Sequence, residues 1–272
     1  MKTCFLPPDQ WRIPYTLEGQ EARHLTKVLR VRPGEAVRVL DGQGREGVFR
    51  ITDISKSQVF LEPEDIRHHP APATSSVLAL GWGKSVRRGW LLEKAVELEA
   101  GGIWLWQAER SQSRVPDDIK ETWEGQLVAG AKQSLNPWLP ELRTLPGGVR
   151  ELAEAGTSFA RRFLLWEDST PSALLSPVML TPPSAHPVLP SLLSPEEPYA
   201  ERTLFVVGPE GGITNKEVDV LIQANFLPVS LGRRVLRWET AALLCLGLHW
   251  WHGELAHAYD DACAAACHGE MS

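Results

Sequence analysis

The feature that most limits the fold is an alternation of short apolar runs with longer helical patterns after residue 76. The apolar runs have the length of strands and lie at 77–80, 103–106, 163–166, 204–207 and 228–231. The expected helices cover 85–99, 117–133, 214–225 and 238–257. Strands that alternate with helices form a mostly parallel sheet with helices on both faces. The sequence therefore predicts an α/β fold whose ligands bind beyond the carboxyl ends of the strands.

The front of the chain has a different pattern. Residues 1–66 alternate short β-type runs with turn signals such as Asp41-Gly42-Gln43-Gly44. The stretch 66–76 has two prolines and no periodicity, as is typical of a connection between domains. We therefore expect a β domain over 1–70, an α/β domain over 74–258 and a C-terminal tail over 259–272.

A proline-rich stretch interrupts the second domain. Residues 171–198 hold eight of the 21 prolines of the chain. Proline removes a backbone donor and breaks regular elements. This stretch is predicted to be a long loop without regular structure.

The charge is distributed unevenly. The net charge is −6, yet residues 1–70 hold eleven Lys/Arg and ten Asp/Glu, whereas the remainder holds seventeen and twenty-four. Six basic or titratable side chains lie between residues 22 and 40, where Glu35 is the single acid: Arg23, His24, Lys27, Arg30, Arg32 and Arg38. Such a patch can bind phosphate, and a solvated charged surface is the alternative interpretation.

Export and membrane insertion are not expected. The chain starts without the basic and apolar segments of a signal peptide, and it has no apolar run of membrane-spanning length. Its four cysteines form no CxxC motif or disulfide framework. A reducing, cytoplasmic location is the prediction.

The strongest local motif is an apolar strand that runs into a glycine-rich loop and then a helix. The loop is Gly208-Pro209-Glu210-Gly211-Gly212, and Thr214 with Glu217 forms a capping box that starts the helix. Three glycines allow the backbone to approach a ligand closely, although a tight structural turn would look the same. The spacing does not match a dinucleotide fingerprint, and Glu210 disfavours phosphate.

A second motif has the same strand, loop and helix order. It reads Leu231-Gly232-Arg233-Arg234-Val235-Leu236-Arg237-Trp238-Glu239-Thr240-Ala241-Ala242. Three arginines therefore lie in a loop at the sheet edge where the glycine-rich loop is expected.

Together the two motifs resemble the GPEGG and LGxRxLRxETAA signatures of the bacterial 16S ribosomal RNA uracil-N3 methyltransferases of the SPOUT class. The front segment 24–44 is similar to the PUA-like RNA-binding domain of that family, and 92–98, 109–111 and 132–134 are similar to further family stretches. The resemblance implies a SPOUT-type, trefoil-knotted sheet with helices on both faces, plus a small N-terminal PUA-like β-barrel. It also implies transfer of a methyl group from S-adenosylmethionine to N3 of a uridine in the small ribosomal subunit.

The resemblance implies site residues as well. Arg237 is the expected catalytic cation beside the uracil oxygens, and Glu210 is expected near the donor's sulfonium, as a partner of Arg237 or as a proton acceptor. An ion pair of Arg237 with Glu210 or Glu239 is the structural alternative. The expected S-adenosylmethionine site consists mainly of backbone groups of Leu80, Gly81, Val207, Gly208, Pro209, Glu210, Gly211, Gly212, Leu231, Gly232, Val235 and Leu236. Arg23, His24, Lys27, Arg30 and Arg32 are the expected RNA-binding residues. The helix from Trp238 is expected to form a homodimer interface, although the buried core helix of a monomer would have the same apolar pattern.

Two departures from the family pattern leave the target open. Asn136 stands where many members carry arginine, and Lys132 stands where many carry glutamate. A SPOUT enzyme with another RNA target and an RNA-binding relative without catalysis are therefore alternatives. Cys245 and His249 share a helical face, but tetrahedral zinc sites use tighter ligand clusters, so no metal is predicted.

Overall fold

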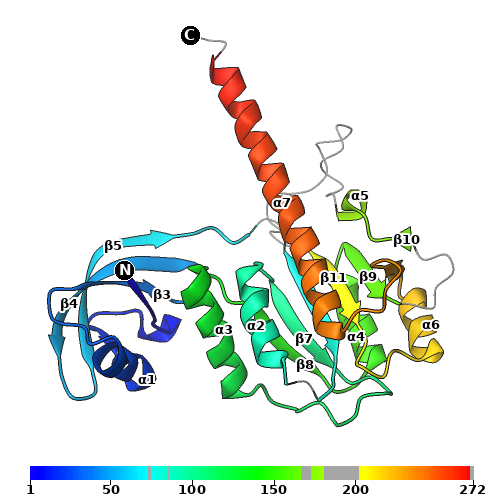
Figure 1. Cartoon of the computed structure of the whole chain (residues 1–272), viewed down its shortest axis with the longest axis horizontal. Helices are drawn as coiled ribbons and strands as arrows, with labels where there is room; N and C mark the ends of the chain where they lie inside the picture. Colours follow the sequence, from blue (N-terminus) through cyan, green and yellow to red (C-terminus); the bar gives the residue numbers. More distant parts are fainter. Residues whose placement is uncertain (73–74, 85, 167–172, 181–201, 270–272) are drawn as a thin grey trace. The chain divides into compact units, whose positions relative to one another are not determined.

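The computed structural model describes residues 1–72, 75–84, 86–166, 173–180 and 202–269 (Figure 1). Compact packing divides the chain into two units. The first comprises residues 1–72, 92–97 and 120–140, and the second comprises 73–91, 98–119 and 141–272. The two units are described separately below.

The first unit contains a curled five-stranded sheet. Its order is β1-β3-β4-β5-β2, so β1 and β2 form two open edges and the sheet is a half-barrel. The strands are β1 (Lys2–Phe5), β2 (Tyr15–Leu17), β3 (Ala36–Leu40), β4 (Arg45–Ile54) and β5 (Val59–His68). The helical elements are η1 (Pro8–Gln10), α1 (Gly19–Arg23), the π-helical turn η2 (His24–Val28) and α3 (Glu121–Ser134). Phe49 is the centre of the core, where the rings of Trp11 and Tyr15 pack edge-on against it.

The second unit contains a seven-stranded sheet in which every pair of described neighbours is parallel. The strand order is β10-β12-β9-β11-β6-β7-β8. The strands are β6 (Ser76–Gly81), β7 (Gly102–Trp106), β8 (Glu141–Leu145), β9 (Arg161–Leu165), β10 (Ala173–Leu174), β11 (Thr203–Val207) and β12 (Leu227–Ser230). The helices are α4 (Val149–Ala155), η3 (Gly156–Ser158), α5 (Pro177–Leu180), α6 (Asn215–Gln223) and α7 (Trp238–Gly269), while α2 (Arg88–Glu97) contributes its first residues.

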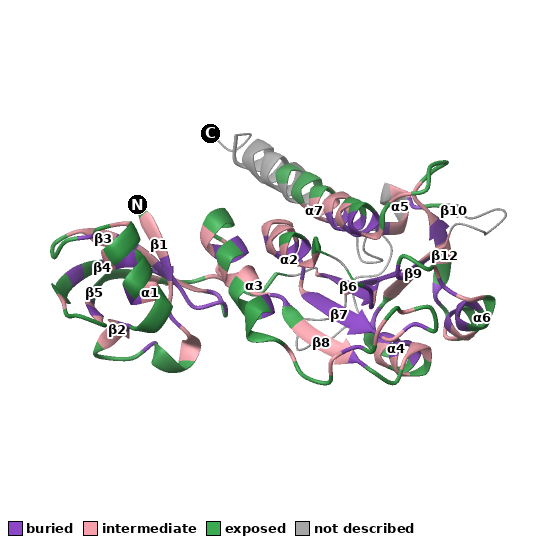
Figure 2. Cartoon of the chain, turned by 60° about the horizontal axis from the view of Figure 1, so that its bottom comes forward, coloured by how far each residue is buried: buried purple, intermediate pink, exposed green. Residues whose placement is uncertain are grey.

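Helices cover both faces of this parallel sheet. Side chains alternate along a strand, so Leu204 and Val206 of β11 share one core with Leu152 of α4 and Leu221 of α6. Phe205 points to the other face, where its ring meets the edge of His249 of α7 at a centroid distance of 6.3 Å. Figure 2 shows the central strands β6 and β7 as buried, in agreement with their burial patterns. The predicted α/β fold is confirmed.

Two elements differ from the predictions. The last helix was expected to end at residue 257, but α7 continues to Gly269. Alanines at 262 and 264–266 explain the extension, because alanine has the highest helix propensity. The predicted absence of regular structure in 171–198 is wrong for β10 and α5; residues 171–172 and 181–198 lie outside the described residues.

Several short elements had no prediction at all. β1, β2 and β8 are strands of three to five residues whose pattern is too short to identify. β1 and β8 find their partners only in the sheet, by pairing with β3 and β7. No helix within the described part of the chain is long and apolar enough to cross a membrane.

Candidate functional site

A pocket of about 740 Å³ lies at the carboxyl end of the parallel sheet, within the second unit. Its walls are the segments that follow β6, β7, β9, β11 and β12. β11 lies between β6 and β9, although both precede it in the chain, so the strand order changes direction here. Such switch points are the usual ligand sites of open parallel sheets, and the volume suits a small organic ligand.

The glycine-rich loop after β11 forms one wall. It is held by backbone bonds and by side chains, since Gly212 N donates to Pro209 O at 2.8 Å and Arg110 Nη1 donates to Gly211 O at 3.1 Å. Gly212 has a φ of +75°, a conformation that favours glycine. Behind the loop, the predicted capping box between Thr214 and Glu217 is present.

Glu217 also connects this wall to the loop after β7. Its carboxylate is buried, with 2% of the residue exposed. Oε1 accepts a bond from Glu109 N at 2.8 Å, while Oε2 accepts from Thr214 N at 2.9 Å and from Thr214 Oγ1 at 3.0 Å. Three donors satisfy this buried charge, so it joins the two loops firmly.

The arginine-rich loop after β12 forms the opposite wall. Arg233, Arg234 and Arg237 are all exposed; Arg234 and Arg237 line the pocket, and Arg233 does not. The acids expected to pair with Arg237 have other partners: Glu239 accepts from Arg87 Nη1 at 3.0 Å, and Glu210 Oε1 accepts from Trp238 Nε1 at 3.0 Å. Within the described residues, no side chain forms an ion pair or hydrogen bond with the Arg237 guanidinium.

The segment after β6 completes the pocket with Lys84, Val86 and Arg87. Next to it, Arg88 stacks over the Trp82 indole at 3.9 Å from the ring centroid and donates to Gly83 O. Burial lowers the pKa of Arg88, and the nearby negative charge of Glu210 acts in the opposite direction. The described lining carries five cationic side chains, namely Lys84, Arg87, Arg110, Arg234 and Arg237, against the carboxylates of Glu210 and Glu239. The pocket is therefore suited to a ligand that carries or develops negative charge.

The structure brings most of the predicted cofactor residues together. The following line the pocket: Val207, Gly208, Pro209, Glu210, Gly211, Gly212, Leu231, Gly232, Val235 and Leu236. Leu80 and Gly81 lie outside the lining. Leu80 is buried, and a Cβ built on Gly81 would collide with Pro209, so Gly81 leaves room for the glycine-rich loop.

Sequence reasoning missed several lining residues: Lys84, Arg87, Arg110, Leu165, Trp166 and Trp238. Trp238 and Arg110 stand inside or next to the motifs that were quoted, so their position was the available signal. Leu165 and Trp166 follow a plain apolar strand and carried no signal.

The predicted RNA-binding residues belong to α1, η2 and the segment that follows them in the first unit. Arg23 ends α1, His24 and Lys27 lie in the π-helical turn, and Arg30 and Arg32 follow it; all five are exposed. Within the described residues, none of these five side chains has an ion pair. The Glu35 carboxylate binds Lys2 Nζ at 2.8 Å, and this hydrogen bond is the main reason why its pKa is lowered.

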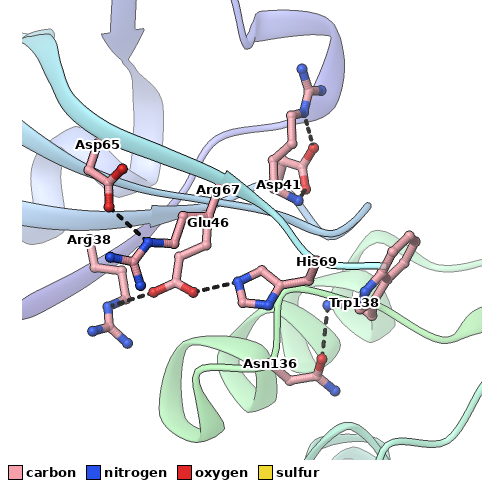
Figure 3. A network of polar contacts seen from close by, with 9 residues as sticks. Arg38, Asp41, Glu46, Asp65, Arg67, His69, Asn136 and Trp138 are labelled. Atoms are coloured by element: carbon pink, nitrogen blue, oxygen red, sulfur yellow. Dashed lines mark hydrogen bonds and ion pairs between the residues drawn. The ribbon is translucent and has the colours of Figure 1, made fainter. Parts of the chain in front are cut away.

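Arg38 differs from the rest of the expected patch because it is paired. Figure 3 shows Arg38 and His69 on two sides of Glu46: Arg38 Nε lies 3.2 Å from Oε1, and His69 Nε2 lies 2.8 Å from Oε2. Arg38 therefore belongs to a network of the sheet. The patch consists of the other five side chains.

The two departures from the family pattern have internal partners in the first unit. Lys132 Nζ binds Glu21 Oε1 at 2.7 Å, and Glu21 Oε2 accepts from Phe5 N at 3.1 Å. Asn136 Nδ2 donates to Val96 O at 2.9 Å, and its Oδ1 accepts from Trp138 N at 2.9 Å (Figure 3). Both residues stabilise the fold of this unit, so they give no reason to change the expected target.

Cys245 and His249 are buried on α7. Burial raises the pKa of the Cys245 thiol, while burial, Arg161 and His252 lower the pKa of His249 to about 4. The described residues contain no group of three His, Cys, Asp or Glu side chains that could hold a metal ion. The side chains of His257, Cys263 and Cys267 lie outside the described ones.

Comparison with known families identifies two domains along the chain. An RNA methyltransferase domain model matches residues 70–250, and an RNA methyltransferase PUA domain model matches residues 17–64. The chain is similar to the ribosomal RNA small subunit methyltransferase E of Bacillus subtilis (strain 168), with 26% identity over 246 residues, which cover 89% of this chain and 91% of that protein. The protein of the same name from Synechocystis is 29% identical over 238 residues, or 85% and 71% of the two chains.

Solved structures give the same result. The ribosomal RNA small subunit methyltransferase E of Neisseria gonorrhoeae, bound to S-adenosyl methionine, superposes with a TM-score of 0.69 at 25% identity and covers 90% of this chain and 95% of its own. A probable rRNA methyltransferase from Porphyromonas gingivalis gives a TM-score of 0.73 at 25% identity, with coverage of 93% and 98%.

Proposed function

Because the chain belongs to the RNA methyltransferase family whose domain model spans residues 70–250, we propose that it methylates N3 of a uridine in the 16S RNA of the small ribosomal subunit. It is an S-adenosylmethionine-dependent rRNA methyltransferase with a PUA domain. The named relatives support the small-subunit target. The choice of atom rests on the resemblance of the two loop motifs and on the chemistry of the pocket.

The main support for this proposal is that the Arg237 guanidinium has no ion-pair or hydrogen-bond partner among the described side chains. A uracil N3–H is a weak acid, so an enzyme that alkylates N3 must stabilise the negative charge that develops on the ring and its oxygens. Arg237 lines the pocket, and the neighbouring acids are bound to Arg87 and Trp238. Its guanidinium is therefore available to the substrate, and preorganised charge of this kind lowers a barrier without further reorganisation.

The pocket also fits the methyl donor, which supplies an electrophilic methyl group on a sulfonium cation. The glycine-rich and arginine-rich loops present backbone groups, which can bind the polar parts of S-adenosylmethionine. A Cβ on Gly232 would meet open space, and its φ of +118° favours glycine, so this loop keeps a backbone surface free for a ligand. The Glu210 carboxylate complements a cation in the same pocket.

Five exposed basic or titratable side chains of the first unit support a role in RNA binding. Arg23, His24, Lys27, Arg30 and Arg32 have no described acid as an ion-pair partner, so they are available to phosphates. α1 and η2 keep Ala22 and Leu25 buried, which leaves the charged side chains outside.

The double variant Lys27→Ala/Arg30→Ala is expected to bind RNA more weakly, and its affinity is expected to depend less on salt concentration. Each lost phosphate contact lowers the slope of log K against log salt by roughly 0.7–0.9. Filter binding of small-subunit RNA between low and moderate salt measures this slope. Lys56→Ala, a substitution elsewhere in the unit, serves as the control, and an unchanged slope in the double variant contradicts the proposed patch.

Further features follow from the same proposal. The exposed apolar residues Leu244, Trp251 and Leu255 of α7 support a homodimer, and the insertion of β11 between β6 and β9 supports the trefoil knot. A ribosomal target supports activity in the cytoplasm. We also propose a first domain over 1–70, a second domain over 74–258 and a tail over 259–272.

The direct test is an incubation of the purified protein with methyl-labelled S-adenosylmethionine and small ribosomal subunits that lack the modification. Nucleoside analysis is expected to find the label in 3-methyluridine. Label in another nucleoside would disprove the proposed target atom and retain the enzyme class. Bound donor without transfer to any RNA would favour a relative that only binds RNA.

A further inference from the structure

Glu210 is exposed, yet its carboxylate has a defined environment on one side of the pocket. Trp238 Nε1 donates to Glu210 Oε1 at 3.0 Å, which joins the glycine-rich loop to the first residue of α7. Gly83 approaches from the other side, so closely that a Cβ on Gly83 would collide with Glu210 Oε2. Arg88 adds a positive charge that interacts with Glu210.

Glu210 and Arg237 both line the pocket, on the loops that follow β11 and β12. Within the described residues, the two side chains form no ion pair with each other, and Glu210 is bound to Trp238 instead. An ion pair between them would neutralise the cation that the proposed reaction requires. The indole N–H of Trp238 is the directional contact that holds the carboxylate elsewhere, since a hydrogen bond to an ionised acceptor is stronger than one between neutral groups.

We propose that Trp238 is a positioning residue that acts through Glu210: its indole N–H holds the Glu210 carboxylate against Gly83 and so leaves Arg237 available to the substrate. The inference rests on the proposed function and names a residue that determines how the same site works. Trp238 exchanges no proton and acts only through the orientation of Glu210.

Two independent substitutions disturb this contact. Trp238→Phe removes the donor and retains an aromatic ring. Gly83→Ala leaves the indole intact and displaces the carboxylate end of the flexible Glu210 side chain, so the substitution costs little stability. Each variant is expected to lower kcat for methyl transfer about five- to tenfold, as for the loss of one ordinary hydrogen bond. Trp90→Phe, a half-exposed tryptophan on α2 that does not line the pocket, is the matched control and retains the wild-type kcat.

A double-mutant cycle tests whether the effect passes through Glu210. In a Glu210→Ala background, Trp238→Phe is expected to cause no further loss of kcat, because the partner is already absent. An equal loss in both backgrounds, or a wild-type kcat in Trp238→Phe, would overturn the inference. Total label transferred to RNA is the readout, so the cycle remains decisive even if the nucleoside is not 3-methyluridine.

A spectroscopic measurement keeps the inference testable without activity. The indole ¹H–¹⁵N resonance of Trp238, identified by its absence in Trp238→Phe, is expected to shift in Glu210→Ala and in Gly83→Ala. A resonance that stays in place in both variants shows that the hydrogen bond does not exist. Failure of the proposed function would instead appear as wild-type protein that binds the donor, has this resonance and transfers no methyl group.

Discussion

Replacing Arg237 with alanine is expected to reduce kcat for methyl transfer by about 10²–10³-fold, the usual loss when a preorganised group that stabilises developing charge is removed. Arg237 lines the pocket, and no described acid neutralises it. In the proposed reaction, its guanidinium stabilises the charge on the uracil as N3 loses its proton. Single-turnover transfer of labelled methyl groups to small subunits measures the effect.

The chain offers a matched control for this substitution. Arg233 lies in the same loop, is exposed and does not line the pocket, so Arg233→Ala is expected to retain kcat and to change RNA affinity at most. Arg237→Lys tests whether the shape of the guanidinium matters as well as its charge, because a lysine keeps the positive charge but lacks the planar fork of donors. If Arg237→Ala transfers methyl groups at the wild-type rate, its proposed catalytic role is wrong.

The second large effect concerns stability. Glu217→Ala is expected to lower the free energy of unfolding of the second unit by about 3 kcal/mol. The substitution removes the Glu217 half of the capping box of α6 and leaves the N–H groups of Glu109 and Thr214 without their acceptor. Urea unfolding followed by circular dichroism gives the change.

Asp219 provides the comparison on the same helix. It is exposed, so Asp219→Ala is expected to change stability by less than about 0.5 kcal/mol. Because Glu217 also joins the loop after β7 to the glycine-rich loop, Glu217→Ala is expected to weaken donor binding as well. If Glu217→Ala lowers the free energy of unfolding by less than about 1 kcal/mol, then water replaces the lost acceptor and the carboxylate does not join the two loops.

Local patterns in the sequence were sufficient for the class of fold and for the loops of the site. Buried parallel strands are continuous apolar runs, which is why β6, β7, β9 and β11 could be predicted within one or two residues. The capping box of Thr214 and Glu217 likewise depends on residues three apart, so the start of α6 was predictable. The two loop motifs identified the family because their residues are contiguous.

Only the tertiary structure decided which side chains pair and which remain available. Arg237 is free of its neighbour Glu239 because Arg87, 152 residues away in sequence, binds that carboxylate. Lys132 is engaged by Glu21 across 111 residues, and Glu109 binds Glu217 across 108. Such contacts depend on tertiary packing; in the second unit, the order of strands in the sheet brings distant loops to one edge. Local propensity and periodicity contain no information about that order, so the sequence by itself determined the elements and the motifs, and packing determined the partners.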